Sequence, residues 1–133
     1  MQLNITTDYA IRILIYLAKN EKLTTAKEIS EAMFIPEGYI GKITRKLKES
    51  GIINTYNGAK GGFELIKNPN DITLLDVINA MEKSIKINRC LEEDNHCNRN
   101  RSNECHIRKY YEVIQNQLEN NLKNITIKNC IDD

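Results

Sequence analysis

The chain of 133 residues has no tryptophan, only two prolines and two histidines, and no long apolar run. A helix that spans a membrane needs about 20 consecutive apolar residues, so the sequence predicts no membrane partner. Residues 1–8 also lack the basic and apolar regions of a signal peptide. Together these absences predict a cytoplasmic protein, and cysteines in that compartment stay reduced.

Residue patterns typical of enzymes are missing as well. The sequence has no glycine loop of the P-loop or dinucleotide type, no histidine near a nucleophile motif and no paired carboxylates in a plausible cleft. The glycines at 58–62 are not followed directly by a helix, which a phosphate loop requires. With 41% hydrophobic and 28% charged residues, the chain has the composition of a folded globular protein. We therefore expect a protein that is not an enzyme.

The formal net charge of +1 does not by itself predict a polyanionic partner. The charge is unevenly distributed, however, because one short stretch is basic. Residues 42–60 contain five basic side chains and a single acidic one, Glu49; the basic ones are Lys42, Arg45, Lys46, Lys48 and Lys60. A local patch of this kind is typical of a nucleic-acid contact.

Three helices are predicted in the first part of the chain. Apolar residues recur at helical spacing over 8–19, 25–33 and 36–50. Thr7 or Asp8 is expected to cap the first helix. Gly51 is expected in the left-handed conformation that commonly ends a helix.

A β-hairpin is predicted next, from strands at 52–56 and 63–66 that flank a glycine-rich turn. Helix, short turn, helix and hairpin is the order of a winged helix-turn-helix. In that fold the last helix enters the major groove, and the hairpin tip reaches the DNA backbone or the minor groove. The candidate DNA contacts are Glu37, Gly38, Tyr39, Lys42, Arg45, Lys46, Asn57, Gly58, Lys60 and Gly61.

The basic residues can also be explained more simply, as the solvated face of a helix. A winged-helix dimer that binds protein in place of DNA is the alternative from another functional class. Binding that weakens steeply as the salt concentration rises would distinguish a DNA-binding protein from this alternative.

The second part of the chain is predicted to form dimerisation helices. A helix is expected over 73–83, and a longer amphipathic helix follows from residue 107. Its apolar positions are spaced by three or four residues: Ile107, Tyr111, Ile114, Leu118, Leu122 and Ile125. Such a seam is typical of a helix that pairs with another helix. We expect a mainly α fold with a small β-hairpin wing, divided into a DNA-binding domain, 1–66, and a dimerisation part, 67–133.

Three of the four cysteines, Cys90, Cys97 and Cys105, lie in a polar segment at about 88–106. A segment with so few apolar side chains cannot offset its own ordering entropy by burial. Bound metal would hold it in place. The spacing alone leaves three alternatives open: an iron–sulfur cluster, a zinc site completed by His96 or His106, and redox-active thiols without metal.

Several motifs resemble those of the IscR/NsrR family of bacterial winged-helix transcription regulators. They are Asp8–Arg12, Ile35–Ile40, Gly58–Phe63, Ile72–Ile78 and the three clustered cysteines. The likeness covers essentially the whole chain in the same order. It implies a homodimer that binds a palindromic operator, and many members hold an iron–sulfur cluster of the 2Fe–2S or 4Fe–4S type.

The resemblance also implies the ligands of the cluster. Cys90, Cys97 and Cys105 match the family's three cysteine ligands. Asp8 matches the acidic fourth ligand that the partner subunit donates in the nitric-oxide-sensing branch. His106 is the second choice, because another branch uses a histidine shortly after the third cysteine. Nitric oxide, redox state or iron–sulfur status is then the expected signal.

The wing departs from the family's pattern at two positions. An arginine that enters the minor groove commonly precedes the first wing glycine, and this chain has Asn57 there. Lys60 stands where the family often has glycine. The operator sequence of relatives therefore cannot be transferred to this chain.

Overall fold

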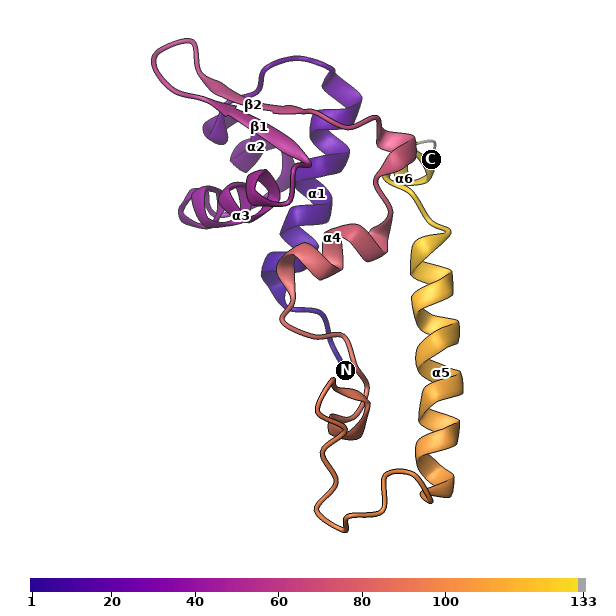
Figure 1. Cartoon of the computed structure of the whole chain (residues 1–133). Coiled ribbons are helices and arrows are strands. Elements are labelled where there is room, and N and C mark those ends of the chain that lie inside the picture. The colour runs from indigo at the N-terminus through magenta and orange to yellow at the C-terminus, as the bar shows by residue number, and fades with distance from the viewer. Residues whose placement is uncertain (132–133) are drawn as a thin grey trace.

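The computed structural model describes residues 1–131, and none of the helices in that range has the length and apolar character needed to cross a membrane. The helices are α1 (Ile5–Asn20), α2 (Ala26–Met33), α3 (Glu37–Glu49), α4 (Leu74–Met81), α5 (His106–Lys123) and α6 (Ile127–Ile131). Strands β1 (Ile53–Tyr56) and β2 (Gly62–Leu65) form one antiparallel hairpin. Figure 1 shows α5 extending to one side of the group formed by α1, α2, α3 and the hairpin. The prediction of a mainly α fold with a β-hairpin wing is confirmed.

Helix α1 begins at Ile5, three residues before the predicted start, so the prediction that Thr7 or Asp8 caps it is wrong. The N-cap is Asn4, and its own side chain makes no capping bond. The carboxylate of Glu82 accepts hydrogen bonds from the Asn4 backbone N–H at 2.8 Å, the Asn4 side-chain amide at 2.7 Å and the Thr7 hydroxyl at 2.8 Å. A carboxylate suits this place because the N–H groups at a helix start lack partners within the helix.

Local contacts and backbone conformations start and end the next two helices. The Thr25 hydroxyl accepts a hydrogen bond from the Glu28 N–H at 3.2 Å and caps α2. Phe34, with φ at 56°, ends α2, and Pro36 is the N-cap of α3. Gly51 lies just beyond α3 with φ at 73°, as expected of a residue that ends a helix.

The hairpin pairs Ile53 with Leu65 and Tyr56 with Gly62. Thr24, which precedes α2, adds a further bridge to Phe63, with N–O distances of 3.0 and 2.8 Å. A Cβ atom on Gly62 would lie 2.5 Å from the Thr24 carbonyl oxygen. Glycine at this position therefore allows the hairpin to lie against the α1–α2 connection.

One hydrophobic core runs through both predicted parts of the chain. Ile13, Ile40 and Leu47 are completely buried in it. The same cluster includes residues beyond position 66, namely Ile72, Val77, Met81 and Ile127. The division into 1–66 and 67–133 therefore stays a prediction about function, because packing does not separate the two parts.

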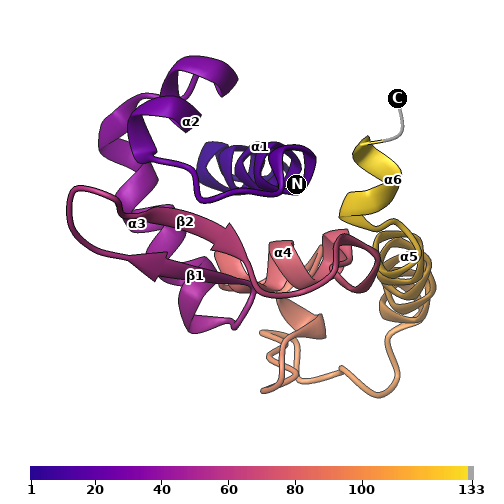
Figure 2. The same ribbon diagram turned by 90° about the horizontal axis from the view of Figure 1, so that it is seen from above.

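After α5 the chain returns to the core, which the sequence pattern did not reveal. The Leu74 N–H donates to the Ile125 carbonyl at 2.8 Å, and the Ile127 N–H donates to the Ile72 carbonyl at 2.9 Å. Helix α6 then packs against α1, and Figure 2 shows it at the end of the long helix. The position of α5 agrees with the predicted long helix, although Ile125 lies just beyond its end.

Candidate functional site

Helix α3 presents one face to the core and leaves the other exposed. Ile40, Ile43 and Leu47 are buried, whereas the predicted DNA contacts Lys42 and Arg45 are exposed. Glu37, Gly38 and Tyr39 are exposed at the start of the helix. This half of the predicted contact set is therefore placed together on one accessible helix face.

Lys46 has different surroundings from the other basic residues of α3. Its side chain is half-buried, and the amine donates a hydrogen bond to the Met81 carbonyl at 3.4 Å. Met81 is the last residue of α4, where carbonyl groups lack partners within the helix. A cation stabilises such an end. In this conformation the Lys46 amine joins α3 to α4, and its contact with DNA stays a prediction.

The hairpin tip carries the other predicted DNA contacts. Asn57, Gly58 and Lys60 are exposed, and Gly61 is half-buried. The Gly61 N–H donates to the Gly58 carbonyl at 3.0 Å and closes the turn. A Cβ atom on Gly61 would lie 2.2 Å from the Tyr56 carbonyl oxygen, so the tight turn requires glycine there. Lys60 is the one cation at this tip.

Asp8, the predicted fourth ligand, lies in the first turn of α1, where its carboxylate is 2.7 Å from the Arg12 guanidinium. Arg12 also donates to the Met33 carbonyl at 3.3 Å and lies over the Tyr9 ring, 5.2 Å from its centroid. The Tyr9 ring in turn meets the Tyr39 ring edge-on at 5.5 Å. This contact chain connects Asp8 to the turn before α3 and to the start of α3 itself.

The three clustered cysteines line one open hollow of about 390 Å³ between the 88–105 segment and the start of α5. Cys90, Cys97 and Cys105 are each half-buried. His96 lines the same hollow, whereas His106, the first residue of α5, is not among its lining residues. The structure thus gathers the three predicted thiol ligands and favours His96 over His106 as a neighbouring imidazole.

The hollow is not a closed metal site. Within residues 1–131, no three side chains of histidine, cysteine, aspartate or glutamate come close enough together to hold a metal ion. Asp8 does not line the hollow either. The cysteine set and Asp8 therefore stay predictions as ligands, and metal binding requires the three thiols to move closer together.

The surroundings of Cys97 favour the thiolate. The backbone N–H groups of Arg101 and Arg99 point toward its sulfur and lower the pKa of this thiol, although partial burial opposes them. The thiolate is the form of cysteine that binds metal. Three thiols on one hollow, one of them held in a setting that favours its anion, fit the donor set of an iron–sulfur cluster.

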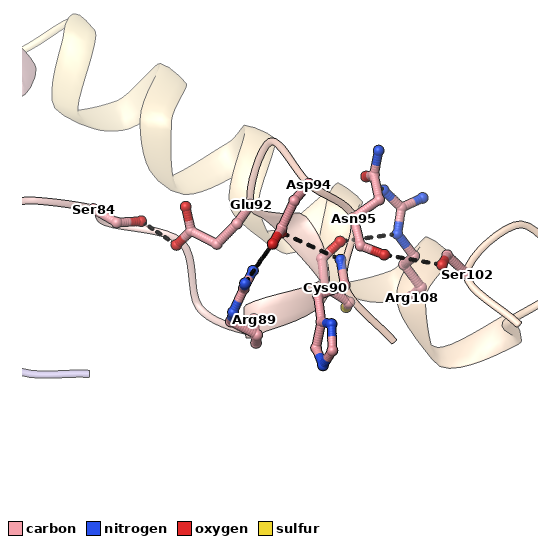
Figure 3. A network of polar contacts seen from close by, with 9 residues as sticks. Ser84, Arg89, Cys90, Glu92, Asp94, Asn95, Ser102 and Arg108 are labelled. Carbon is pink, nitrogen blue, oxygen red and sulfur yellow. Dashed lines mark hydrogen bonds and ion pairs between the residues drawn. The ribbon is translucent and has the colours of Figure 1, made fainter. Parts of the chain in front are cut away.

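Polar contacts hold the segment that carries these cysteines (Figure 3). Arg89 and Asp94 form a two-pronged ion pair, with both N–O distances at 2.5 Å. This pairing lowers the pKa of the Asp94 carboxyl to about 2. The Ser84 hydroxyl donates to the Glu92 carboxylate, which ties the segment to the end of α4. Side-chain pairing thus replaces the apolar core that the segment lacks.

Helix α5 has an apolar face that this chain does not cover. Six large side chains on the helix or just beyond it are more than a third exposed: Ile107 at 52%, Tyr110 at 67%, Val113 at 55%, Ile114 at 49%, Leu118 at 38% and Ile125 at 39%. A contiguous apolar surface of this kind commonly marks an interaction site. The homodimer predicted from the seam would cover it.

An exposed basic helix face, set on a three-helix core and followed by a hairpin, defines this chain as a winged helix-turn-helix protein. Comparison with protein families is specific: the model described as Rrf2, an iron-dependent transcriptional regulator, matches residues 3–133. The chain belongs to the Rrf2 family, which confirms the resemblance to IscR/NsrR-type regulators.

Named relatives agree with this assignment. The chain is 34% identical to the HTH-type transcriptional regulator NsrR of Shouchella clausii over 100 residues, which are 73% of this chain and 67% of the relative. Its fold is similar to CymR, the global cysteine regulator of B. subtilis, with a TM-score of 0.77, 24% identity and 98% and 96% of the two chains covered. The fold is also similar to that of IscR of T. potens, with a TM-score of 0.76 and 22% identity; the match covers 98% of this chain and 86% of that one. The chain is a bacterial DNA-binding transcription regulator, and the prediction that it is not an enzyme is confirmed.

Proposed function

We propose that this regulator is a homodimer whose affinity for a palindromic operator is controlled by an iron–sulfur cluster. Cys90, Cys97 and Cys105 are the protein's thiolate ligands, and Asp8 of the partner subunit is the fourth. The observation that carries the proposal is the single hollow that all three thiols line. The signal is nitric oxide, redox state or iron–sulfur status.

Membership of the Rrf2 family supports a cluster more than zinc, because cysteine thiolates by themselves suit both. Thiolates are the ligands of iron–sulfur clusters, and a 2Fe–2S or 4Fe–4S cluster supplies iron that exchanges electrons and reacts with nitric oxide. A carboxylate such as Asp8 is a weaker ligand than a thiolate and leaves its iron more accessible. The protein's part is to hold the thiolates together, and the N–H groups around Cys97 assist by stabilising its anion.

Asp8 supplies the connection between ligand binding and DNA binding. In this structure its carboxylate pairs with Arg12, and Arg12 contacts both the Met33 carbonyl and the Tyr9 ring. A carboxylate that serves as a ligand cannot hold Arg12 in the same way. Exchange of Asp8 between the two roles therefore changes the contacts that position α2 and α3.

The apolar face of α5 supports the homodimer. Two recognition helices related by a two-fold axis must meet major grooves one helical turn, about 34 Å, apart. A small rotation of one subunit against the other misplaces one helix, so the dimer interface determines operator affinity. Burial of Ile107, Ile114 and Leu118 against the same residues of a second copy would fix this spacing.

Binding to the DNA upstream of the protein's own gene tests the proposal. The protein is purified without oxygen, and fluorescence anisotropy is measured before and after treatment with nitric oxide, over a series of salt concentrations. The proposal predicts an affinity that falls steeply with salt and changes at least tenfold with nitric oxide. Absence of salt-dependent binding to any DNA would favour the protein-binding dimer, and binding insensitive to nitric oxide and to oxidants would refute cluster control.

A further inference from the structure

We infer that Arg108 is the positioning residue that gathers the three cysteines around their hollow. The inference rests on the proposed function only in taking these cysteines as the ligands. Arg108 is not a ligand itself. Its guanidinium contacts the parts of the polar segment that carry Cys90 and Cys97, from a helix that starts beside Cys105.

The first step is the position of Arg108 on α5. Cys105 is the N-cap of that helix, and Arg108 follows within its first turn. The side chain of Arg108 is 19% exposed, and Glu112, one turn further along, holds its Nη1 at 2.6 Å. Because α5 is a rigid element, this pair gives the guanidinium a fixed position relative to Cys105.

The second step is the reach of the guanidinium across to the segment. Its Nε donates to the carbonyl of Cys90 at 3.3 Å, and its Nη2 donates to the side-chain oxygen of Asn95 at 2.8 Å. Figure 3 shows Arg108 beside Asn95 with Cys90 close by. The guanidinium of Arg108 therefore joins Cys90 and Asn95 to α5, the helix that begins directly after Cys105. Asn95 lies two positions before Cys97.

Asn95 is itself fixed in an unusual conformation. Its φ of 49° lies in the left-handed region, which asparagine tolerates better than most residues. Its carbonyl accepts a hydrogen bond from the Ser102 hydroxyl at 3.0 Å. The chain between residues 95 and 102 is thus closed into a loop that contains Cys97. Arg108 holds this loop from outside through the Asn95 side chain.

The chemistry requires arginine in particular. Three acceptors, the Cys90 carbonyl, the Asn95 amide oxygen and the Glu112 carboxylate, are satisfied by separate N–H groups of one rigid planar fork. A lysine amine keeps the positive charge but cannot reproduce this arrangement of donors. Other contacts also hold the start of the segment, since the buried Gln115 pairs with the backbone of Ile85 and Ile87. Loss of Arg108 should therefore loosen the cysteine loop without unfolding the domain.

The test uses the full chain without iron, reduced and kept under nitrogen, with Cys130→Ser in every variant so that only the three thiols remain. The probe is phenylarsine oxide, which binds two neighbouring thiols and releases water. The rate of closure of the second sulfur–arsenic bond reports how close the thiols are held. We expect Arg108→Ala to slow this closure about tenfold, because the effective concentration of the second thiol falls.

Three further variants separate positioning from charge and from stability. Arg108→Lys should close the second sulfur–arsenic bond as slowly as Arg108→Ala does. Lys109→Ala changes an exposed neighbour on the same helix and should close it at the parental rate.

Asn95→Ala removes one partner of Arg108 but leaves the ion pair between Arg108 and Glu112 intact, so closure should slow severalfold. The double variant Asn95→Ala/Arg108→Ala should close the bond no more slowly than Arg108→Ala alone, because Asn95 and Arg108 act through one contact. Asn95→Ala also keeps the test valid if Arg108→Ala does not fold.

The inference is overturned if Asn95→Ala and a folded Arg108→Ala close the second sulfur–arsenic bond at the parental rate. It is also overturned if Arg108→Lys closes that bond at the parental rate. Iron and acid-labile sulfide are measured on anaerobically purified parent protein in parallel. A parent without sulfide whose Arg108 variants still react slowly would refute the cluster and leave the positioning role standing. A parent with a cluster and unaffected variants would refute the positioning role alone.

Discussion

The Asp8 carboxylate lies 2.7 Å from the Arg12 guanidinium, one turn further along α1. Arg12 also donates to the carbonyl of Met33, next to the turn between α2 and α3. A residue proposed to bind the cluster is therefore connected to the helix-turn-helix through one intervening side chain, that of Arg12. This relationship gives the proposed sensor a short route to the DNA-binding surface.

Replacement of Asp8 by alanine should separate its two roles. Side chains in the pair are 37% and 49% exposed, so we expect the free energy of unfolding to fall by less than about 1 kcal/mol. The absorption and circular dichroism spectra of the anaerobically purified protein should change clearly, because a ligand is lost. Glu31→Ala, which removes an exposed carboxylate on α2, should leave the spectra unchanged. Identical spectra for parent and Asp8→Ala would restrict Asp8 to pairing with Arg12.

The exposed cations of α3 should contribute directly to DNA affinity. Lys42→Ala and Arg45→Ala should each weaken operator binding and reduce the slope of log K against log salt by about 0.9, if each neutralises one phosphate. Lys123→Ala on α5 removes the same charge far along the chain and should leave the slope unchanged. Equal slopes for all three variants would assign Lys42 and Arg45 to a solvated helix face.

The apolar face of α5 should control the oligomeric state. Ile114 is 49% exposed in the single chain, and Ile114→Glu places a charge in the middle of the proposed interface. We expect this variant to be monomeric by light scattering and to bind a palindromic operator at least tenfold more weakly. Asn120→Glu, on another side of the helix, should remain dimeric. A dimeric Ile114→Glu would place the interface elsewhere.

The pairing of Arg89 with Asp94 makes the cysteine segment sensitive to acid. The pKa of Asp94 is lowered from 3.8 to about 2 because Arg89 donates two hydrogen bonds to its charged form. A carboxyl with a lowered folded-state pKa stabilises the fold above its unfolded pKa. That contribution should be lost as the pH falls from about 4 to about 2. Carboxyl NMR titration should give a midpoint near 2 for Asp94 and a higher one in Arg89→Ala; equal midpoints would contradict the pairing.

Local signals in the sequence predicted the helix ends that depend on neighbouring residues. Gly51 has the left-handed conformation that was expected of it, and Thr25 and Thr73 cap the helices that were expected over 25–33 and 73–83. The start of α1 was missed because its cap comes from Glu82, 78 positions after Asn4. Helix α6 was missed because it has five residues and depends on packing against α1. Contacts between distant segments leave no periodic pattern to recognise.

The same limit applies to the site. Cysteine spacing in a polar segment predicted the three thiols that share one hollow. The sequence did not indicate that Arg108 would reach the carbonyl of Cys90, 18 positions earlier, or that the Lys46 amine would turn toward Met81. Helical periodicity places a residue on a face, whereas the partner of a long polar side chain depends on the tertiary arrangement.

Iron and acid-labile sulfide content of the anaerobically purified protein most directly tests the central claim, that the three cysteines hold an iron–sulfur cluster. The proposed function predicts iron and sulfide in similar amounts, with both lost in Cys97→Ser and both retained in Cys130→Ser. Zinc without sulfide in the parent protein, or sulfide that survives in Cys97→Ser, would contradict it.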